Sequence, residues 1–195
     1  MKTIFKLSAT AGLLFTVAVG MAREPKMELI SKGEVKSLVF QMDSPTSETF
    51  VKLMDDQDHI IFNDKVSSGN YAKKFNLSAL EDGHYYFSTE NAIKTLVYTI
   101  SIDDSELTLI DRKERTKPVF RKKEDKIFLN LLNLDGNDVD IKILDSDHRT
   151  IYAETIKDET IVEKAFNFED AFEDTYTIIV KDKEDSYYEY VTVYN

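Results

Sequence analysis

Histidine is the side chain that most often supplies a general base or a metal ligand near neutral pH, and the chain contains three, His59, His84 and His148. His59 and His148 fall at matched positions, each directly after an aspartate in the polar stretches DDQDH and DSDH. Neither histidine lies in a sequence pattern that links it to a nucleophile or to a second catalytic acid. We therefore expect exposed hairpin turns at both places, and we assign no catalytic residue.

An acidic stretch, LDGNDVD, offers side-chain oxygens that a calcium ion would accept, from Asp135, Asn137, Asp138 and Asp140. An EF-hand loop requires glycine at its sixth position and glutamate at its twelfth. Here Asp140 and Ser146 hold those places. Asp-Gly-Asn-Asp between two apolar runs is also typical of a tight turn. We assign no metal and no other cofactor to the chain, and calcium binding at residues 135–140 stays open.

The stretch SYYEYVTVYN near the end of the chain places tyrosines at alternate positions. On a strand, one face would carry Tyr188, Tyr190 and Tyr194, and the other would carry Val191 and Val193. An exposed tyrosine offers apolar area together with a polar hydroxyl, which suits a protein partner or a sugar. Packing on an ordinary sheet face is the other interpretation. We predict these three tyrosines as binding residues, with a protein as the partner and a glycan as the alternative.

Motifs of common enzyme classes are missing from the chain. The sequence contains no glycine-rich phosphate loop, no Gly-x-Ser-x-Gly stretch and no His-Glu pair of the zinc protease type. It also contains no cysteine, which excludes disulfides, thiolate zinc sites and thiol catalysis. We therefore expect a protein that is not an enzyme.

Short runs rich in Val, Ile, Tyr, Phe and Thr, separated by Asp, Asn, Ser and Gly, follow one another at the spacing typical of a sandwich or barrel. No window shows a convincing helical period with caps. The pattern predicts an all-β fold. The expected strands are residues 38–42, 50–54, 59–63, 85–88, 96–102, 127–132, 139–144, 150–155, 175–180 and 187–194.

Two halves of the chain resemble each other. FNLSALEDGHYYF is repeated as FNFEDAFEDTYTI, and VKLMDDQDHIIF as IKILDSDHRTIY, at an offset that drifts only between 89 and 92. This is self-similarity at the period of a small domain. We predict two tandem antiparallel Ig-like β-sandwich domains, residues 23–111 and 119–195. The charge-rich stretch DRKERTKP supplies the linker, residues 112–118.

The repeated stretch has the spacing of a tyrosine corner, in which a Tyr at the start of a strand returns its hydroxyl to the backbone a few residues upstream. Leu80, Gly83 and Tyr85 form L-x-x-G-x-Y in the first copy, and Tyr176 holds the same place in the second. Asp174 stands where Gly83 stood, which makes a positive backbone angle costlier there.

Potentially reactive residues are not kept between the copies, because His84 is replaced by Thr175 and Ser78 by Glu169. The residues that both copies share are apolar or belong to the predicted tyrosine corner. The repetition therefore indicates scaffold rather than a duplicated catalytic loop.

With these motifs the chain resembles the small Ig-like β-sandwich modules of exported Bacteroidetes proteins. It is similar in particular to the C-terminal sorting domain of the type IX secretion system. Leu80, Gly83 and Tyr85 match the middle motif of that family, and Tyr176 matches in the second copy without the glycine. The resemblance implies a β-sandwich and an export or surface-attachment role.

The chain begins with Lys2 and Lys6, an uncharged run over residues 7–22, and the small residues Gly20 and Ala22. This is the pattern of a secretory signal peptide, and the run is shorter than the roughly 18 residues or more of a spanning helix. We predict a signal peptide over residues 1–22 and no integral membrane segment in the mature chain. The lipid-anchored form is excluded because the chain has no cysteine.

The formal net charge of the full sequence is −11. Removing residues 1–22, which hold two lysines and no acids, leaves 23 positive against 36 negative side chains, or −13. Such a field repels nucleic acid and anionic membrane surfaces. We therefore expect an exported, non-enzymatic structural or protein-interaction module of the bacterial envelope, periplasmic or at the cell surface. Carbohydrate binding and a sorting-like role are the alternatives.

Overall fold

A computed structural model of the chain describes residues 24–32, 35–43, 45, 47–104 and 106–194. The expected signal peptide lies outside these residues. The described residues form antiparallel strands and turns and no helix, so the all-β prediction is confirmed. None of them belongs to a helix long and apolar enough to cross a membrane.

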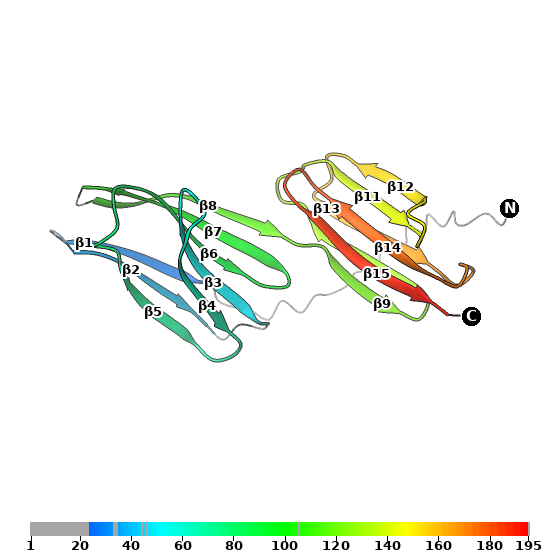
Figure 1. Ribbon diagram of the computed structural model, residues 1–195, viewed down its shortest axis with the longest axis horizontal. Coiled ribbons are helices and arrows are strands. Elements are labelled where there is room, and N and C mark those ends of the chain that lie inside the picture. The colour runs from blue at the N-terminus through cyan, green and yellow to red at the C-terminus, as the bar shows by residue number, and fades with distance from the viewer. Residues whose placement is uncertain (1–23, 33–34, 44, 46, 105, 195) are drawn as a thin grey trace. The chain divides into compact units, whose positions relative to one another are not determined.

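The described chain divides into two compact units, residues 24–115 and 116–194, called the first and the second unit below. The first unit has a three-stranded sheet in the order β1-β2-β5 and a five-stranded sheet in the order β4-β3-β6-β7-β8 (Figure 1). Its strands are β1 Lys26–Lys32, β2 Val35–Met42, β3 Thr49–Asp55, β4 Ile60–Val66, β5 Tyr71–Asn76, β6 Gly83–Glu90, β7 Lys94–Asp103 and β8 Glu106–Thr116.

The second unit repeats this strand order with one strand fewer. Its sheets run β9-β10-β13 and β12-β11-β14-β15, which match β1-β2-β5 and β4-β3-β6-β7. The second unit thus has no strand equivalent to β8 among its described residues. Its strands are β9 Val119–Lys123, β10 Lys126–Leu132, β11 Val139–Leu144, β12 Thr150–Ile156, β13 Ile161–Asn167, β14 Asp174–Lys181 and β15 Ser186–Val193.

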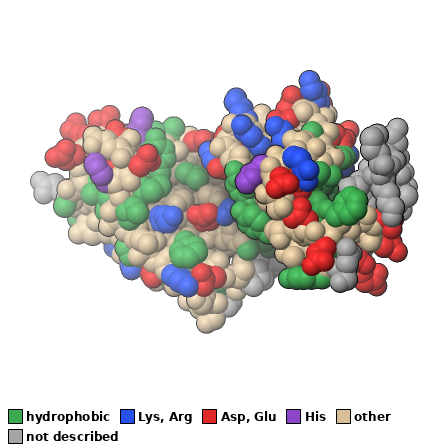
Figure 2. Space-filling view, turned by 45° about the vertical axis from the view of Figure 1, so that its right-hand side comes forward, with side chains coloured by type: hydrophobic (Ala, Val, Ile, Leu, Met, Phe, Trp, Pro, Cys, Tyr) green, Lys and Arg blue, Asp and Glu red, His purple; other side chains and the backbone are tan. Residues whose placement is uncertain are grey.

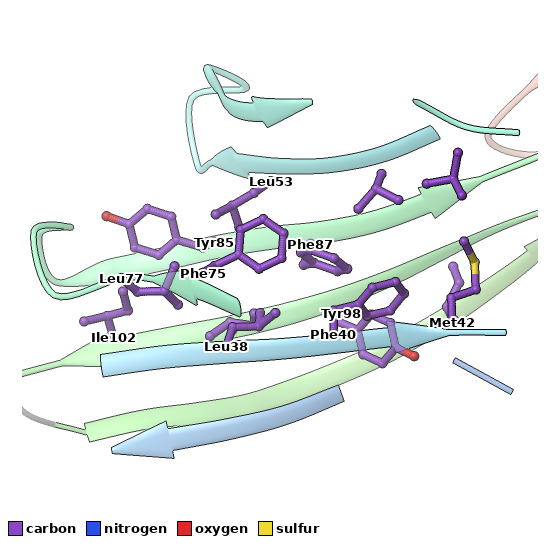
Figure 3. Close-up of a cluster of buried hydrophobic side chains, with 14 residues drawn as sticks. Leu38, Phe40, Met42, Leu53, Phe75, Leu77, Tyr85, Phe87, Tyr98 and Ile102 are labelled. Carbon is purple, nitrogen blue, oxygen red and sulfur yellow. The ribbon is translucent and has the colours of Figure 1, made fainter. Parts of the chain in front are cut away.

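The core of the first unit lies between its two sheets and is rich in aromatic rings. Phe87 is fully buried, and its ring centroid lies 4.7 Å from that of Phe40, 5.5 Å from that of Phe75 and 6.4 Å from that of Tyr98. Figure 3 shows these rings clustered in the interior, with Leu38 beside them. Strand alternation places them there, because alternate residues of β2, β6 and β7 point inward.

The core of the second unit is mostly aliphatic. Ile178 and Leu129, both buried, hold the places of Phe87 and Phe40. Two aromatic contacts occur in this core, with ring centroids 5.3 Å apart for Phe168 and Tyr176 and 5.6 Å apart for Tyr152 and Phe166. Each unit therefore buries its own apolar cluster, and the strand order does not depend on one set of core side chains.

The linker expected over residues 112–118 is mostly strand, which corrects that prediction. β8 continues to Thr116 and β9 begins at Val119, so only Lys117 and Pro118 lie between the two strands. The division between the units falls after residue 115 rather than after 111. The charged letters of DRKERT belong to a strand at the edge of a sheet, where lysine and arginine are tolerated.

Candidate functional site

Both repeated stretches form a corner closed by a tyrosine hydroxyl. Tyr85 donates its hydroxyl to the carbonyl oxygen of Glu81 at 2.8 Å, and Tyr176 donates to the carbonyl oxygen of Phe172 at 3.1 Å. Both rings are buried, and Leu80 packs against the core of the first unit. The shared letters therefore hold the crossing between sheets and present no reactive group to solvent.

The two corners differ in backbone conformation. Gly83 has a φ of 155°, which residues with a side chain rarely adopt. Asp174, at the same place in the second unit, is not among the described residues with positive φ. Its carboxylate instead accepts hydrogen bonds from the backbone N–H of Thr175 at 2.7 Å and of Ser146 at 3.3 Å. The second corner thus forms without the positive φ that aspartate would make costlier at this position.

His59 and His148 lie in hairpin turns but are not structurally matched, and His84 lies in β6. Asp55 and Asp145 begin the two turns, and the positive φ of 62° at Asp58 corresponds to 61° at His148. His59 therefore corresponds to Arg149, one residue later. The prediction that His59 and His148 are equivalent is wrong, because the register of each turn is set by its left-handed residue and not by residue type.

The conserved feature of these turns is an aspartate that faces a basic side chain. Asp55 Oδ2 lies 3.0 Å from His59 Nδ1, and Asp145 Oδ2 lies 2.7 Å from Arg149 Nε and 2.7 Å from Arg149 Nη2. Burial opposes ionisation of Asp145, but hydrogen bonds from the backbone and side chain of Arg149 outweigh it and lower the pKa of this carboxyl. These contacts close the two turns.

The acidic loop after β10 is held by an amide side chain. Asn133 is buried, and its Nδ2 donates to the carbonyl oxygens of Asn137 and Glu159, both at 2.8 Å. Gly136 has a φ of 62°, and its N–H donates to the carbonyl oxygen of Asn133. Among the described residues, no group of three or more His, Asp or Glu side chains could hold a metal ion. The geometry of this loop is that of a turn.

The three tyrosines predicted as binding residues are exposed on one strand and its end. The exposed fractions are 55% for Tyr188, 68% for Tyr190 and 81% for Tyr194. Val191 is buried on the opposite face of β15 and belongs to the core of the second unit. β15 is the last strand of its sheet within the described chain, because only β14 pairs with it. The tyrosines therefore lie beside an outer strand edge.

Sequence analysis missed the residue that distinguishes this strand. Tyr85 pairs with Ile100 of β7, and Tyr176 pairs with Val191 of β15. Two residues earlier, the same inward-facing place holds Tyr98 in β7 and Glu189 in β15. Tyr98 is buried, whereas Glu189 is half-buried. Aligning the strands on the corner tyrosines would have revealed this substitution of an acid for a ring.

In the first unit, the sandwich opens sideways into a shallow groove of about 520 Å³ between β1 and β8, lined in part by Met27, Tyr98 and Arg112. Arg112 Nη2 lies 3.5 Å from Glu24 Oε2 and 3.7 Å from Glu114 Oε2. The arginine is thus shared between two carboxylates. Hydrophobic side chains on the face drawn in Figure 2 are interrupted by acidic and basic ones.

Comparison of the sequence with protein-family models and with curated protein sequences found no match. Among solved structures, the chain is similar to one described as biofilm associated protein, BSP domain, with 14% identity and a TM-score of 0.29 over 86% of this chain and 29% of that one. It is also similar to an uncultured Clostridium sp. beta-glucuronidase, with 10% identity and a TM-score of 0.28 over 87% of this chain and 34% of that one. The chain spans about a third of each, and at these TM-scores neither likeness bears on function.

Proposed function

We propose that this chain is an exported, non-enzymatic structural or protein-interaction module of the bacterial envelope, in the periplasm or at the cell surface. The observation that carries the proposal is the row of exposed tyrosines on an outer strand, Tyr188 and Tyr190 on β15 with Tyr194 beyond its end. Tyrosine is enriched at protein interfaces because its ring gives contact area and its hydroxyl gives a hydrogen bond. The N-terminal pattern over residues 1–22 supports export.

Site-specific photo-crosslinking in cells tests this proposal. A photoreactive amino acid placed at Tyr190 should give a discrete protein adduct in envelope fractions. The matched control is the same amino acid at Ile151, which is exposed on β12 at the opposite edge of the same sheet. Equal labelling from both positions, or none from Tyr190, would argue against an interaction surface at this strand.

Carbohydrate binding is the second candidate, because Tyr188 and Tyr190 point from the same sheet face two residues apart. Rings spaced in this way offer apolar platforms to a sugar. A glycan array probed with the full chain and with Tyr190→Ala separates the candidates. Binding that disappears with the ring supports sugar recognition, and silence across the array removes it.

A further inference from the structure

The first unit shows how a further strand covers the sheet edge that is uncovered at β15 in the second unit. In the first unit, β8 follows β7 by a hairpin and becomes the last strand of its sheet. Its Leu107 packs against the buried cluster. Five residues later, Arg112 forms a hydrogen bond with the side chain of Tyr98, which is the main cause of the raised pKa of this arginine. β8 thus packs an apolar residue against the core and brings a basic side chain to Tyr98 of β7.

In the second unit, the equivalent place is occupied by an acid. Glu189 pairs across the strands with Ile178, which is fully buried, just as Tyr98 pairs with Phe87. Glu189 is therefore on the core side of an outer strand, half-buried, and it has no ion-pair partner among the described residues. Partial burial weakens its solvation, so that an added positive charge at this place would be favoured.

We propose that the outer edge of β15 binds an extended segment of another polypeptide by antiparallel strand addition, with an arginine or lysine of that segment opposite Glu189. This inference rests on the proposed protein-interaction function and specifies its site and the chemistry of the partner. Main-chain hydrogen bonds to the open edge supply affinity, and the side chains of alternate residues supply selectivity. The partner segment has the character of β8, which packs an apolar residue, Leu107, against the core and brings a basic one, Arg112, to the side chain of the neighbouring strand.

Charge argues against two other occupants. An apolar strand would bury the Glu189 carboxylate without a partner, which is costly. A second copy of β15 would bring two such carboxylates near each other across a two-fold axis, on a chain whose net charge is already −11. Inward-pointing charges on outer strands are a known defence against self-pairing. The acid thus selects a basic strand and rejects self-association.

The peptide ELTLIDRKERT, the sequence of β8, is a suitable probe. It would be titrated into the isotope-labelled full chain while backbone amide resonances are followed. We expect saturable shifts in β15, and an affinity about three- to fivefold weaker for the peptide variant Arg112→Glu. The protein variant Glu189→Lys should weaken binding of the original peptide and restore binding of the Arg112→Glu peptide.

Each remaining outcome counts against the inference. Shifts confined to β7, or none in β15 at millimolar peptide, overturn strand addition at this edge. If the original peptide and its Arg112→Glu variant bind with equal affinity, the partner residue opposite Glu189 is not basic. This comparison uses the unchanged protein, so it holds even if Glu189→Lys folds poorly. Dimerisation of the full chain through β15, seen by light scattering, overturns the choice of occupant. A crosslinked partner at Tyr190 without a response in β15 would leave the proposed function standing and remove only this inference.

Discussion

The first and the second unit share a strand order and a tyrosine-closed corner, but they differ in core and in outer edge. Aromatic rings fill the first core around Phe87, whereas Ile178 holds that place in the second. The first unit covers β7 with β8, whereas β15 of the second unit ends its sheet with Glu189 facing inward.

The comparison separates what the fold requires from what each unit adds. Corner bonds and strand order survive the replacement of most core side chains, as expected when apolar pattern and volume decide the fold. The outer strand is different, because β15 carries an acid where the matching strand β7 carries a buried ring. Features confined to the second unit are therefore the better candidates for function, and those common to both units are candidates for packing.

The largest expected effect comes from the aromatic core. Phe87→Ala removes a ring that contacts three others and should lower the free energy of unfolding of the first unit by about 3–5 kcal/mol, and Ile178→Ala should lower that of the second by about 2–5 kcal/mol. Hydrogen exchange of β6 and β14 amides reads the units separately. Equal loss of protection in both strands from Phe87→Ala alone would break the comparison, because the two cores would then unfold as one.

The corners offer a smaller and sharper contrast. Gly83→Ala forces a side chain into a φ of 155° and should cost about 1–3 kcal/mol, although a Cβ at this place would meet no atom within 4 Å. Asp174→Ala meets no such strain and loses only hydrogen bonds that the side chain accepts. Urea unfolding of the two variants measures the difference. A harmless Gly83→Ala would show that the two corners share one backbone requirement.

Tyr85→Phe and Tyr176→Phe each remove one hydroxyl and keep the ring. Each should lower the free energy of unfolding by about 0.5–1.5 kcal/mol, because one buried hydrogen bond to a backbone carbonyl is lost. Urea unfolding measures both losses, and Tyr86→Phe is the control because Tyr86 does not close a corner. Similar losses for Tyr85→Phe and Tyr176→Phe would support one role for both residues. A loss in only one unit would mean that the second corner is held by its other contacts.

The smallest effect concerns the turns and appears only in acid. The pKa of Asp145 lies below its ordinary value of 3.8, as does that of Asp55. A carboxyl with a lowered pKa in the folded state stabilises it above the unfolded pKa, and this contribution is lost as pH falls through the folded pKa. Asp145→Asn should therefore be less stable at neutral pH and should lose less on going from about pH 4 to pH 2. An unchanged acid transition followed by circular dichroism would contradict this.

Sequence patterns predicted the central strands and missed a particular class of outer ones. The five unpredicted strands are β1, β5, β8, β9 and β13, and each lies at the edge of its sheet. All five contain charged residues, which include at least one lysine or arginine. An edge strand has water along one side, so that charged residues are favoured there and the apolar alternation that marks a strand is weakened.

The candidate site was only partly visible in the sequence for a related reason. Alternation in YYEYVTV separates Tyr188 and Tyr190 from the buried Val191, and this face assignment agrees with the exposures observed. Aligning the corner tyrosines places Glu189 opposite Tyr98 in the sequence, but the pairing of β15 with β14 was needed to show that this acid lies beside the buried Ile178. The local sequence pattern of one strand does not specify which distant strand it pairs with.

Two units with the same strand order on one chain can misfold during synthesis, because a strand of one unit can pair with the sheet of the other before either unit is complete. If β15 took the place of β7, Glu189 would come to rest against the ring of Phe87 in a dry interior, and the misassembled product would be penalised. Burial of the Glu189 carboxylate would therefore disfavour the exchange of β15 for β7 between the two units.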